Sequence, residues 1–165
     1  IWRHPRTGAT LYIGNVNAAS NLAVLKDKNV THVVNCTDSM PNYHQHTGEI
    51  VYHRFDIAAW WRSVDATTES ARRFTSPMFN FVGDALSHGN SVMVHCLAGA
   101  HRAGTTGCLC LMHFAAMDSS TAVACAKRCR PVVDPIGSLP ELLRKVEAAY
   151  REEPPQTRYS AAHFA

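Results

Sequence analysis

The stretch that decides the fold is SVMVHCLAGAHRAGTTG, which covers residues 91–107. Its first five residues, Ser91 to His95, form a valine-rich run typical of a strand that is covered on both faces in a central parallel sheet. A glycine-bearing turn follows Cys96, and we expect a helix to begin near Arg102. The pattern therefore predicts a strand, a tight turn and a helix. The N-terminus of such a helix lies at the carboxyl edge of the sheet, where unpaired amides and the positive end of the helix dipole attract an anion.

The turn between Cys96 and Arg102 has the composition of an oxyanion site. Successive backbone N–H groups can point at one tetrahedral anion, and Gly99 permits a positive φ or a close backbone approach. The guanidinium of Arg102 can grip two phosphate oxygens, and the field of the helix N-terminus favours the thiolate form of Cys96. These residues predict attack on phosphorus by Cys96. The expected phosphate-binding residues are Leu97, Ala98, Gly99, Ala100, His101 and Arg102.

Strands and helices alternate before this stretch, and helices follow it. Strands are predicted at residues 11–13, 31–36 and 50–55. A helix is expected after an N-cap at Ser20-Asn21, and a second carries apolar residues at helical spacing between Phe74 and Ala85, with a fresh start at Ser76-Pro77. Later helices are expected over residues 118–129 and after a capping box at residues 138–141. The expected fold class is α/β, with a central, mostly parallel sheet flanked by helices.

Bulk composition narrows the range of partners. The chain has 165 residues, with 16 Lys and Arg against 13 Asp and Glu, so its net charge of +3 suits anionic substrates but is too small to indicate nucleic-acid binding. The longest apolar run, residues 108–117, is too short to cross a bilayer, so no membrane partner is expected. The six cysteines are spaced neither as a disulfide framework nor as a metal site. We therefore expect a cytoplasmic or nuclear protein that uses no metal and no other cofactor.

HCLAGAHR, residues 95–102, resembles the His-Cys-x5-Arg signature of the cysteine-dependent protein phosphatases. LYIGNVNAASNLAVLKDKNVTHVVNCT (residues 11–37) resembles the opening of the small, atypical dual-specificity phosphatases, and RCRPVVDPIGSLPELLRKVE (residues 128–147) resembles their closing segment. The resemblance implies the protein tyrosine phosphatase-like fold and hydrolysis of phosphotyrosine and phosphoserine or phosphothreonine on proteins through a phosphocysteine intermediate. No stretch resembles the phosphotyrosine-recognition loop of the larger tyrosine-specific enzymes, which suggests a shallow pocket. We expect one catalytic domain over residues 1–153 and a flexible tail over residues 154–165.

The resemblance also implies an aspartate general acid on the loop that precedes the helix leading back to the Cys96 strand. In this chain the loop is FDIAAWWRSVDATTE, residues 55–69, and it contains Asp56 and Asp65. Asp65 lies 31 positions before Cys96, close to the family's usual separation, whereas Asp56 lies where the incoming strand ends. We therefore favour Asp65 as the acid and keep Asp56 as the alternative. Asp65 can also cap the following helix.

Three positions around the cysteine bear on how the loop works. Most relatives carry Ser or Thr after the arginine, where the hydroxyl donates to the cysteine sulfur and helps the thiolate leave; this chain has Ala103. A phosphocysteine is expected to persist longer here unless Thr105 or Thr106 reaches the sulfur. His101 either brings positive charge near the phosphate or faces away and braces a neighbouring loop, which we favour. His95 is expected to point away from the pocket and to organise the loop.

Two further features have alternative interpretations. Cys36 ends a strand expected beside the Cys96 strand, and in some small relatives a cysteine near this position forms a reversible disulfide with the nucleophile. Cys36 is therefore either a redox partner of Cys96 or a buried core residue. Trp60 and Trp61 are either a packing anchor, which we favour, or an exposed platform at the rim of the pocket.

Three functions stay open, in descending order of preference. A dual-specificity protein phosphatase acting on phosphorylated proteins is favoured. A glucan phosphatase or an RNA 5′-phosphatase would use the same chemistry on another substrate; exposed tryptophans would indicate the first, and the small net charge weighs against the second. A catalytically weak phospho-binding module is the third possibility, because of Ala103. The absence of lysine from the loop disfavours inositol lipids as substrates.

Overall fold

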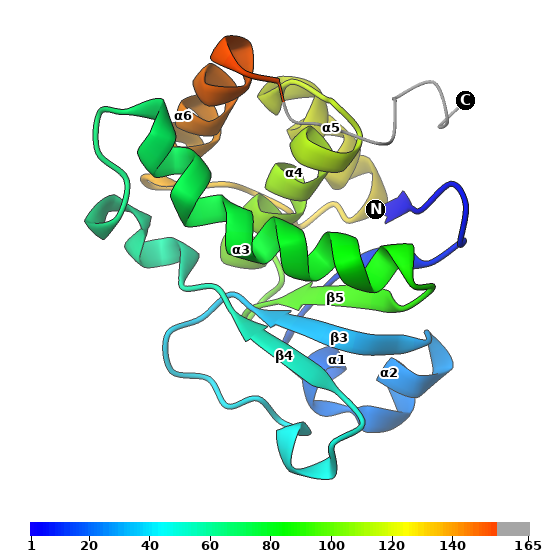
Figure 1. Ribbon diagram of the computed structural model, residues 1–165. Coiled ribbons are helices and arrows are strands. Elements are labelled where there is room, and N and C mark those ends of the chain that lie inside the picture. Colours follow the sequence, from blue (N-terminus) through cyan, green and yellow to red (C-terminus); the bar gives the residue numbers. More distant parts are fainter. Residues whose placement is uncertain (155–165) are drawn as a thin grey trace.

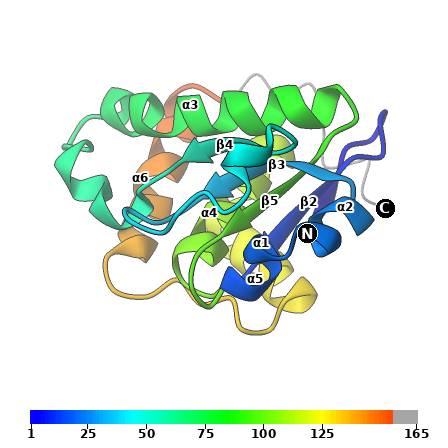
Figure 2. The ribbon, with the colours of Figure 1, turned by 90° about the horizontal axis from the view of Figure 1, so that it is seen from below.

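A five-stranded sheet runs through the middle of the molecule, with helices on both faces (Figures 1 and 2). The computed structural model describes residues 1–154, so all but the first residue of the tail predicted at 154–165 lies outside the described residues. The strand order is β1-β2-β5-β3-β4, and all neighbours are parallel except β1 and β2. The strands are β1 (Trp2–Arg3), β2 (Thr10–Gly14), β3 (Val30–Asn35), β4 (Val51–Arg54) and β5 (Ser91–His95). The predicted fold class is confirmed.

The helices are divided unequally between the two faces of the sheet (Figure 2). Two short helices, α1 (Val16–Ser20) and α2 (Leu22–Asp27), cover one face. The other face carries α3 (Thr68–Ser87), α4 (Arg102–Phe114), α5 (Ser119–Cys129) and α6 (Leu139–Glu152). Two 3-10 turns, Gln45–Thr47 and Ile57–Arg62, lie in the loops before and after β4. No helix within residues 1–154 has the length and apolar character needed to pass through a bilayer.

Strand β5 is buried along its whole length, and its side chains alternate between two cores. Val92 and Val94 belong to the large core beneath α3 to α6, whereas Met93 belongs to the small core beneath α1 and α2. Because successive side chains of a strand point to opposite faces, Cys96 falls on the side of α4 and His95 on the side of α1. The alternation of side chains along β5 thus places Cys96 at the N-terminus of α4.

The helix start predicted at Ser76-Pro77 is wrong, whereas the start predicted at Ser138 is confirmed, because α6 begins at Leu139 with Ser138 as its N-cap residue. The helix α3 runs unbroken through Ser76 and Pro77, because its apolar face packs along the sheet and hydroxyls support the local backbone. Pro77 has no N–H to donate to the carbonyl of Arg73, four residues earlier. Ser76 Oγ donates to the adjacent carbonyl, that of Arg72, at 2.6 Å. The capping box at Ser138 is absent: Ser138 Oγ makes no cap bond and instead accepts from the indole N–H of Trp60 at 3.1 Å.

Candidate active site

The loop between β5 and α4, residues 96–102, is held from outside by its own carbonyl groups. Four consecutive carbonyls accept hydrogen bonds from other parts of the chain. The bonds run from Val16 N to Leu97 O (3.0 Å), from Arg130 Nη2 to Ala98 O (3.1 Å), from Arg130 Nε to Gly99 O (3.0 Å) and from Asp134 N to Ala100 O (2.9 Å). In a trans peptide the C=O and the following N–H point in opposite directions. The amides of residues 98–101 therefore point to the inside of the loop, which makes it an anion cradle.

Gly99 meets both conditions expected of it. Its φ is +65°, in the region that side chains rarely adopt. A Cβ at this position would lie 2.6 Å from the carbonyl oxygen of Gly14 and 2.9 Å from Arg130 Nη2. The loop can approach the end of β2 and the guanidinium of Arg130 only because residue 99 has no side chain.

Cys96 lies at the base of the cradle and is almost completely buried. Its sulfur accepts a hydrogen bond from the backbone N–H of Ala103 at 3.4 Å, and Arg102 is the first residue of α4. The sulfur thus faces the first turn of the helix, at the positive end of the helix dipole. Cys96, the loop amides and the helix start at Arg102 thus lie within one short turn, and their catalytic roles stay predictions.

No side-chain hydroxyl among the described residues donates to the Cys96 sulfur. Ala103 has none, and the two threonines that follow it direct theirs elsewhere. Thr105 Oγ1 donates to the carbonyl of His101 at 2.6 Å, and Thr106 Oγ1 donates to the carbonyl of Arg102 at 2.9 Å. Both threonines bond one turn back along α4, so neither replaces the missing hydroxyl at position 103.

Asp65 lies on the surface at the start of α3, where it holds the helix cap. Its carboxylate accepts from the Thr67 amide at 2.7 Å and from the Thr67 hydroxyl at 2.6 Å, and Thr67 is the N-cap residue of α3. These bonds, with smaller contributions from Ser70 and Arg73, lower the pKa of Asp65 to about 2. In this conformation the group is an anion. Both Thr67 bonds go to Oδ1, so a proton for general acid catalysis would be carried by Oδ2.

Asp56 precedes the 3-10 turn at Ile57–Arg62 and lines a separate hollow together with His53 and Arg62. Within residues 1–154, neither Asp56 nor Asp65 makes a hydrogen bond or ion pair with Cys96 or Arg102. The assignment of the acid therefore stays a prediction.

The tryptophan pair is split between the two roles considered for it. Trp60 is buried, and its indole N–H donates to Ser138 Oγ at the start of α6, so it is a packing anchor. Trp61 is 61% exposed, and the guanidinium of Arg62 lies 5.2 Å from its ring centroid. Only Trp61 is available to a ligand.

The two histidines of the loop region both face away from the cradle. His101 Nδ1 lies 2.6 Å from the carbonyl oxygen of Asp134, so His101 braces the segment between α5 and α6, as favoured from the sequence. His95 is fully buried on the opposite face of the sheet, and its ring centroid lies 6.4 Å from that of Tyr43. Burial first, and then the charges of Arg54 and Arg102, lower the pKa of His95. The ring is therefore neutral at physiological pH.

Cys36 directly follows β3 and lies beside the nucleophile's strand. Its backbone N–H donates to the carbonyl of His95 at 2.9 Å, and both Cys36 and Cys96 are free thiols. Burial, with a smaller contribution from the neighbouring Cys96, raises the pKa of Cys36 to about 12. The buried Cys36 thiol is therefore protonated in this structure, and its role as a core residue or as a redox partner stays open.

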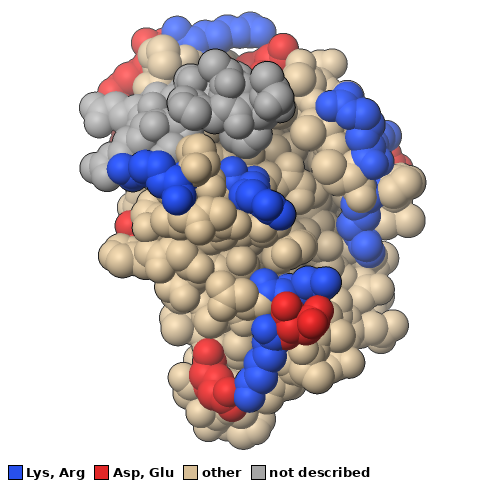
Figure 3. Space-filling view, turned by 90° about the vertical axis from the view of Figure 1, so that its right-hand side faces the viewer, with Lys and Arg blue, Asp and Glu red and all other residues tan. Residues whose placement is uncertain are grey.

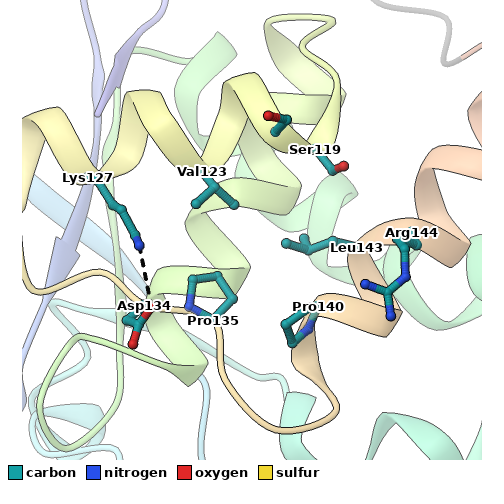
Figure 4. Close-up of a pocket in the computed structure, with 9 residues that line it drawn as sticks. Ser119, Val123, Lys127, Asp134, Pro135, Pro140, Leu143 and Arg144 are labelled. Carbon is teal, nitrogen blue, oxygen red and sulfur yellow. Dashed lines mark hydrogen bonds and ion pairs between the residues drawn. The ribbon is translucent and has the colours of Figure 1, made fainter.

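A groove of about 390 Å³ lies between α5 and α6, next to the cradle but separate from it (Figure 4). Its walls include Lys127, Asp134 and Arg144, with Val123 and Leu143 between them, and none of residues 96–102. Asp134 belongs to both regions, because its side chain faces Lys127 across the groove at 3.4 Å while its backbone is bonded to the cradle. The groove therefore lies beside the loop of residues 96–102 and shares no lining residue with it.

Arg130 is the residue of the site that the sequence analysis missed. Its two hydrogen bonds hold the cradle from behind, although it lies 28 positions after Arg102. The segment RCRPVVDPIG, residues 128–137, carries the family resemblance but has no chemical pattern of its own, and nothing in it indicated a contact with the loop.

Comparisons with known proteins identify the family of the chain. The family model "Dual specificity phosphatase, catalytic domain" matches residues 11–148. The chain is 28% identical over 125 residues to human dual specificity protein phosphatase 9, covering 76% of this chain and 31% of that protein. It is 32% identical over 137 residues to dual specificity protein phosphatase 1 of Arabidopsis thaliana, covering 83% of this chain and 65% of that protein. The chain spans about a third of the length of the first curated relatives it matches.

Solved structures show the same fold. The crystal structure of human DUSP28 superposes with a TM-score of 0.73 at 22% identity and covers 90% of this chain and 98% of that one. The human tyrosine phosphatase-like serine/threonine/tyrosine-interacting protein superposes with a TM-score of 0.66 at 23% identity, covering 86% of this chain and 93% of that one.

Proposed function

Because the chain belongs to the dual-specificity phosphatase family, we propose that it hydrolyses phosphotyrosine and phosphoserine or phosphothreonine on proteins through a phosphocysteine intermediate. The observation that carries the proposal is the cradle itself. Four loop carbonyls are turned outward, the amides of residues 98–101 point inward, and the Cys96 sulfur lies at the base. Such a site stabilises a phosphoryl group as charge develops on its oxygens.

In the first step the Cys96 thiolate attacks phosphorus. The S–P bond forms while the bond from phosphorus to the substrate oxygen breaks, and Arg102 and the loop amides bind the three remaining oxygens. The leaving oxygen takes a proton from Asp65, which must first be protonated, at the Oδ2 that Thr67 does not bond. Because Asp65 makes no hydrogen bond with Cys96 or Arg102 within the described residues, we expect the loop that carries it to move toward the cradle for this step.

In the second step the Asp65 carboxylate accepts a proton from water. The water oxygen attacks phosphorus, the S–P bond breaks, and the thiolate of Cys96 returns with release of inorganic phosphate. The leaving sulfur has the backbone N–H of Ala103 as its hydrogen-bond donor and no hydroxyl donor among the described residues. We expect this step to limit turnover.

Dual specificity is part of the proposal, because no stretch of the chain resembles the phosphotyrosine-recognition loop that deepens the pocket of tyrosine-specific enzymes. Leu97, the first residue after the nucleophile, is 57% exposed, so the loop lies near the surface. A shallow entrance lets the short side chains of phosphoserine and phosphothreonine reach the sulfur as well as phosphotyrosine. A glucan substrate is less favoured, because only one of the two tryptophans is exposed. The small net charge of +3 weighs against a groove for RNA. Figure 3 shows one face of the molecule, on which Lys and Arg lie in several separate groups.

The deciding experiment compares turnover of a small aryl phosphate by the wild type, Cys96→Ser and Asp65→Asn. Cys96→Ser should abolish turnover, and Asp65→Asn should lower kcat and flatten its dependence on pH. Cys108→Ser is the matched control, because it changes another buried cysteine of the same chain. Activity that survives in Cys96→Ser would overturn the mechanism. A wild type that binds phosphopeptides without hydrolysing them would instead indicate a phospho-binding module. A cytoplasmic or nuclear location stays a prediction.

A further inference from the structure

Arg130 lies directly behind the cradle, where α5 ends. It is the C-cap residue of α5, and its extended backbone turns its side chain toward the loop. Its Nε donates to the carbonyl of Gly99 at 3.0 Å and its Nη2 donates to the carbonyl of Ala98 at 3.1 Å. One planar guanidinium thus binds two successive carbonyls of the phosphate loop.

The contact is close and directional. Arg130 Nη2 lies within 2.9 Å of where a Cβ of residue 99 would be, so the guanidinium packs against the sharpest point of the loop. Two donors in a fixed plane specify the orientation of two adjacent peptide groups, which a single ammonium donor does not. Within residues 1–154 Arg130 makes no ion pair with an acidic side chain, so its hydrogen bonds go to the loop.

These contacts determine where the loop amides point. The peptides that carry the carbonyls of Ala98 and Gly99 also carry the N–H groups of Gly99 and Ala100. If either peptide flips, an amide donor leaves the cradle and a carbonyl oxygen replaces it, which repels the phosphate oxygens. We infer that Arg130 is a positioning residue, which fixes the phosphate cradle from behind without touching the substrate. The inference rests on the proposed function for its kinetic consequence, although not for its effect on anion binding.

The neighbouring bonds act in the same direction. Asp134 donates its backbone N–H to the carbonyl of Ala100, and its own carbonyl bonds His101. Lys127 pairs with the Asp134 side chain across the groove in Figure 4. The segment from Arg130 to Asp134, which we call the brace segment, therefore holds three consecutive carbonyls of the loop. Arg130 supplies two of these three bonds through its side chain alone, which makes it the member that mutation can test.

The test uses Arg130→Met and Arg130→Lys, with Arg128→Met as the matched control. Arg128 is exposed on the same helix and makes no hydrogen bond or ion pair within residues 1–154, so its replacement changes the charge equally and leaves the brace intact. Two quantities are measured: the dissociation constant of inorganic phosphate by calorimetry, and kcat and KM for an aryl phosphate. Circular dichroism and thermal unfolding show whether each variant folds.

Arg130→Met should weaken phosphate binding and lower kcat/KM by roughly ten- to a hundred-fold, with a fall in kcat as well as a rise in KM. Arg130→Lys should lie between this variant and the wild type, because it keeps the charge and one donor. Arg128→Met should stay within about two-fold of the wild type. A folded Arg130→Met that binds phosphate as tightly as Arg128→Met would overturn the inference.

Two other outcomes are also decisive. If Arg130→Met does not fold, Arg130→Lys decides: phosphate binding weakened by several-fold supports the inference, and binding equal to that of the wild type refutes it. If the wild type shows no turnover, the proposed function fails. A loss of phosphate binding in Arg130→Met but not in Arg128→Met would still support the positioning role.

Discussion

Replacement of Gly99 by alanine tests the geometry of the cradle most directly. Two costs follow from the structure. The φ of +65° costs a residue with a side chain about 1–2 kcal/mol. The added Cβ would also lie 2.6 Å from Gly14 O, a backbone atom that cannot rotate away, and relief of such a contact costs about 1–3 kcal/mol. Gly99→Ala should therefore lower the free energy of unfolding by about 2–5 kcal/mol.

Gly48→Ala is the matched control, because it separates the two costs. Gly48 has a similar φ of +69°, but nothing lies within 4 Å of an added Cβ. Its replacement should cost only the backbone term, about 1–2 kcal/mol. Urea unfolding of the two variants and the wild type, fitted with a common slope, gives the difference that belongs to the contact with Gly14.

The two variants should differ in activity as well. In Gly99→Ala the loop must move away from Gly14 and Arg130, so its backbone N–H groups no longer point at one phosphate group. As a result kcat/KM should fall by more than about ten-fold. Gly48→Ala should keep wild-type kinetics. If Gly99→Ala is no less stable than Gly48→Ala and hydrolyses an aryl phosphate at the wild-type rate, the close approach at Gly14 does not shape the cradle and the reasoning is wrong.

Four further predictions concern the chemistry and its dependence on pH. Ala103→Ser should place a hydroxyl near the Cys96 sulfur and speed breakdown of the phosphocysteine; rapid-quench kinetics with no change in that step would contradict this. Thr67→Ala removes a hydroxyl that bonds Asp65, so the pKa of Asp65 should rise from about 2, as carboxyl chemical shifts would show. If Cys36 is a redox partner, peroxide should inactivate the wild type reversibly and Cys36→Ser irreversibly; equal recovery of both with a thiol reductant would favour a core role. The stacked rings of His113 and Phe79 have centroids 4.0 Å apart. Burial lowers the pKa of His113 from 6.5 to about 4, so folding favours the neutral ring. Its stabilising contribution is complete above pH 6.5 and declines as the pH falls toward 4, and urea unfolding of His113→Phe should lack this decline.

The strands and helix caps that depend on a few neighbouring residues were predicted well. The strand Ser91–His95 was predicted residue for residue, because a valine-rich run followed by a glycine turn admits few other structures. Asn21 caps α2 as expected, since its side chain accepts from the Val24 amide. The positive φ expected at Gly99 is confirmed, because it depends on a short turn, whereas the catalytic roles of Cys96 and Arg102 stay predictions.

The errors arise where a distant residue competes for a local partner. Residues 138–141 have the sequence of a capping box, but the Ser138 hydroxyl accepts a hydrogen bond from the indole N–H of Trp60 instead of from the helix backbone. The pattern at Ser76-Pro77 is that of a helix start, but packing against the sheet carries α3 through it. Arg130 was not assigned a role, because its partners at residues 98 and 99 lie on another element and only the fold brings them together.

The outward carbonyls of the cradle couple anion binding to the folding of the whole chain. Their donors come from the start of α1, the end of α5 and the connection to α6, so the amides are aligned only after the two ends of the sequence have assembled on the sheet. A partly folded chain then has no phosphate site, whatever the state of β5. Phosphate, which binds the native state alone, stabilises it by RT ln(1 + [L]/Kd), about 2.7 kcal/mol at a hundred times Kd. The shift of the melting temperature with phosphate concentration would therefore report how completely the molecule has assembled.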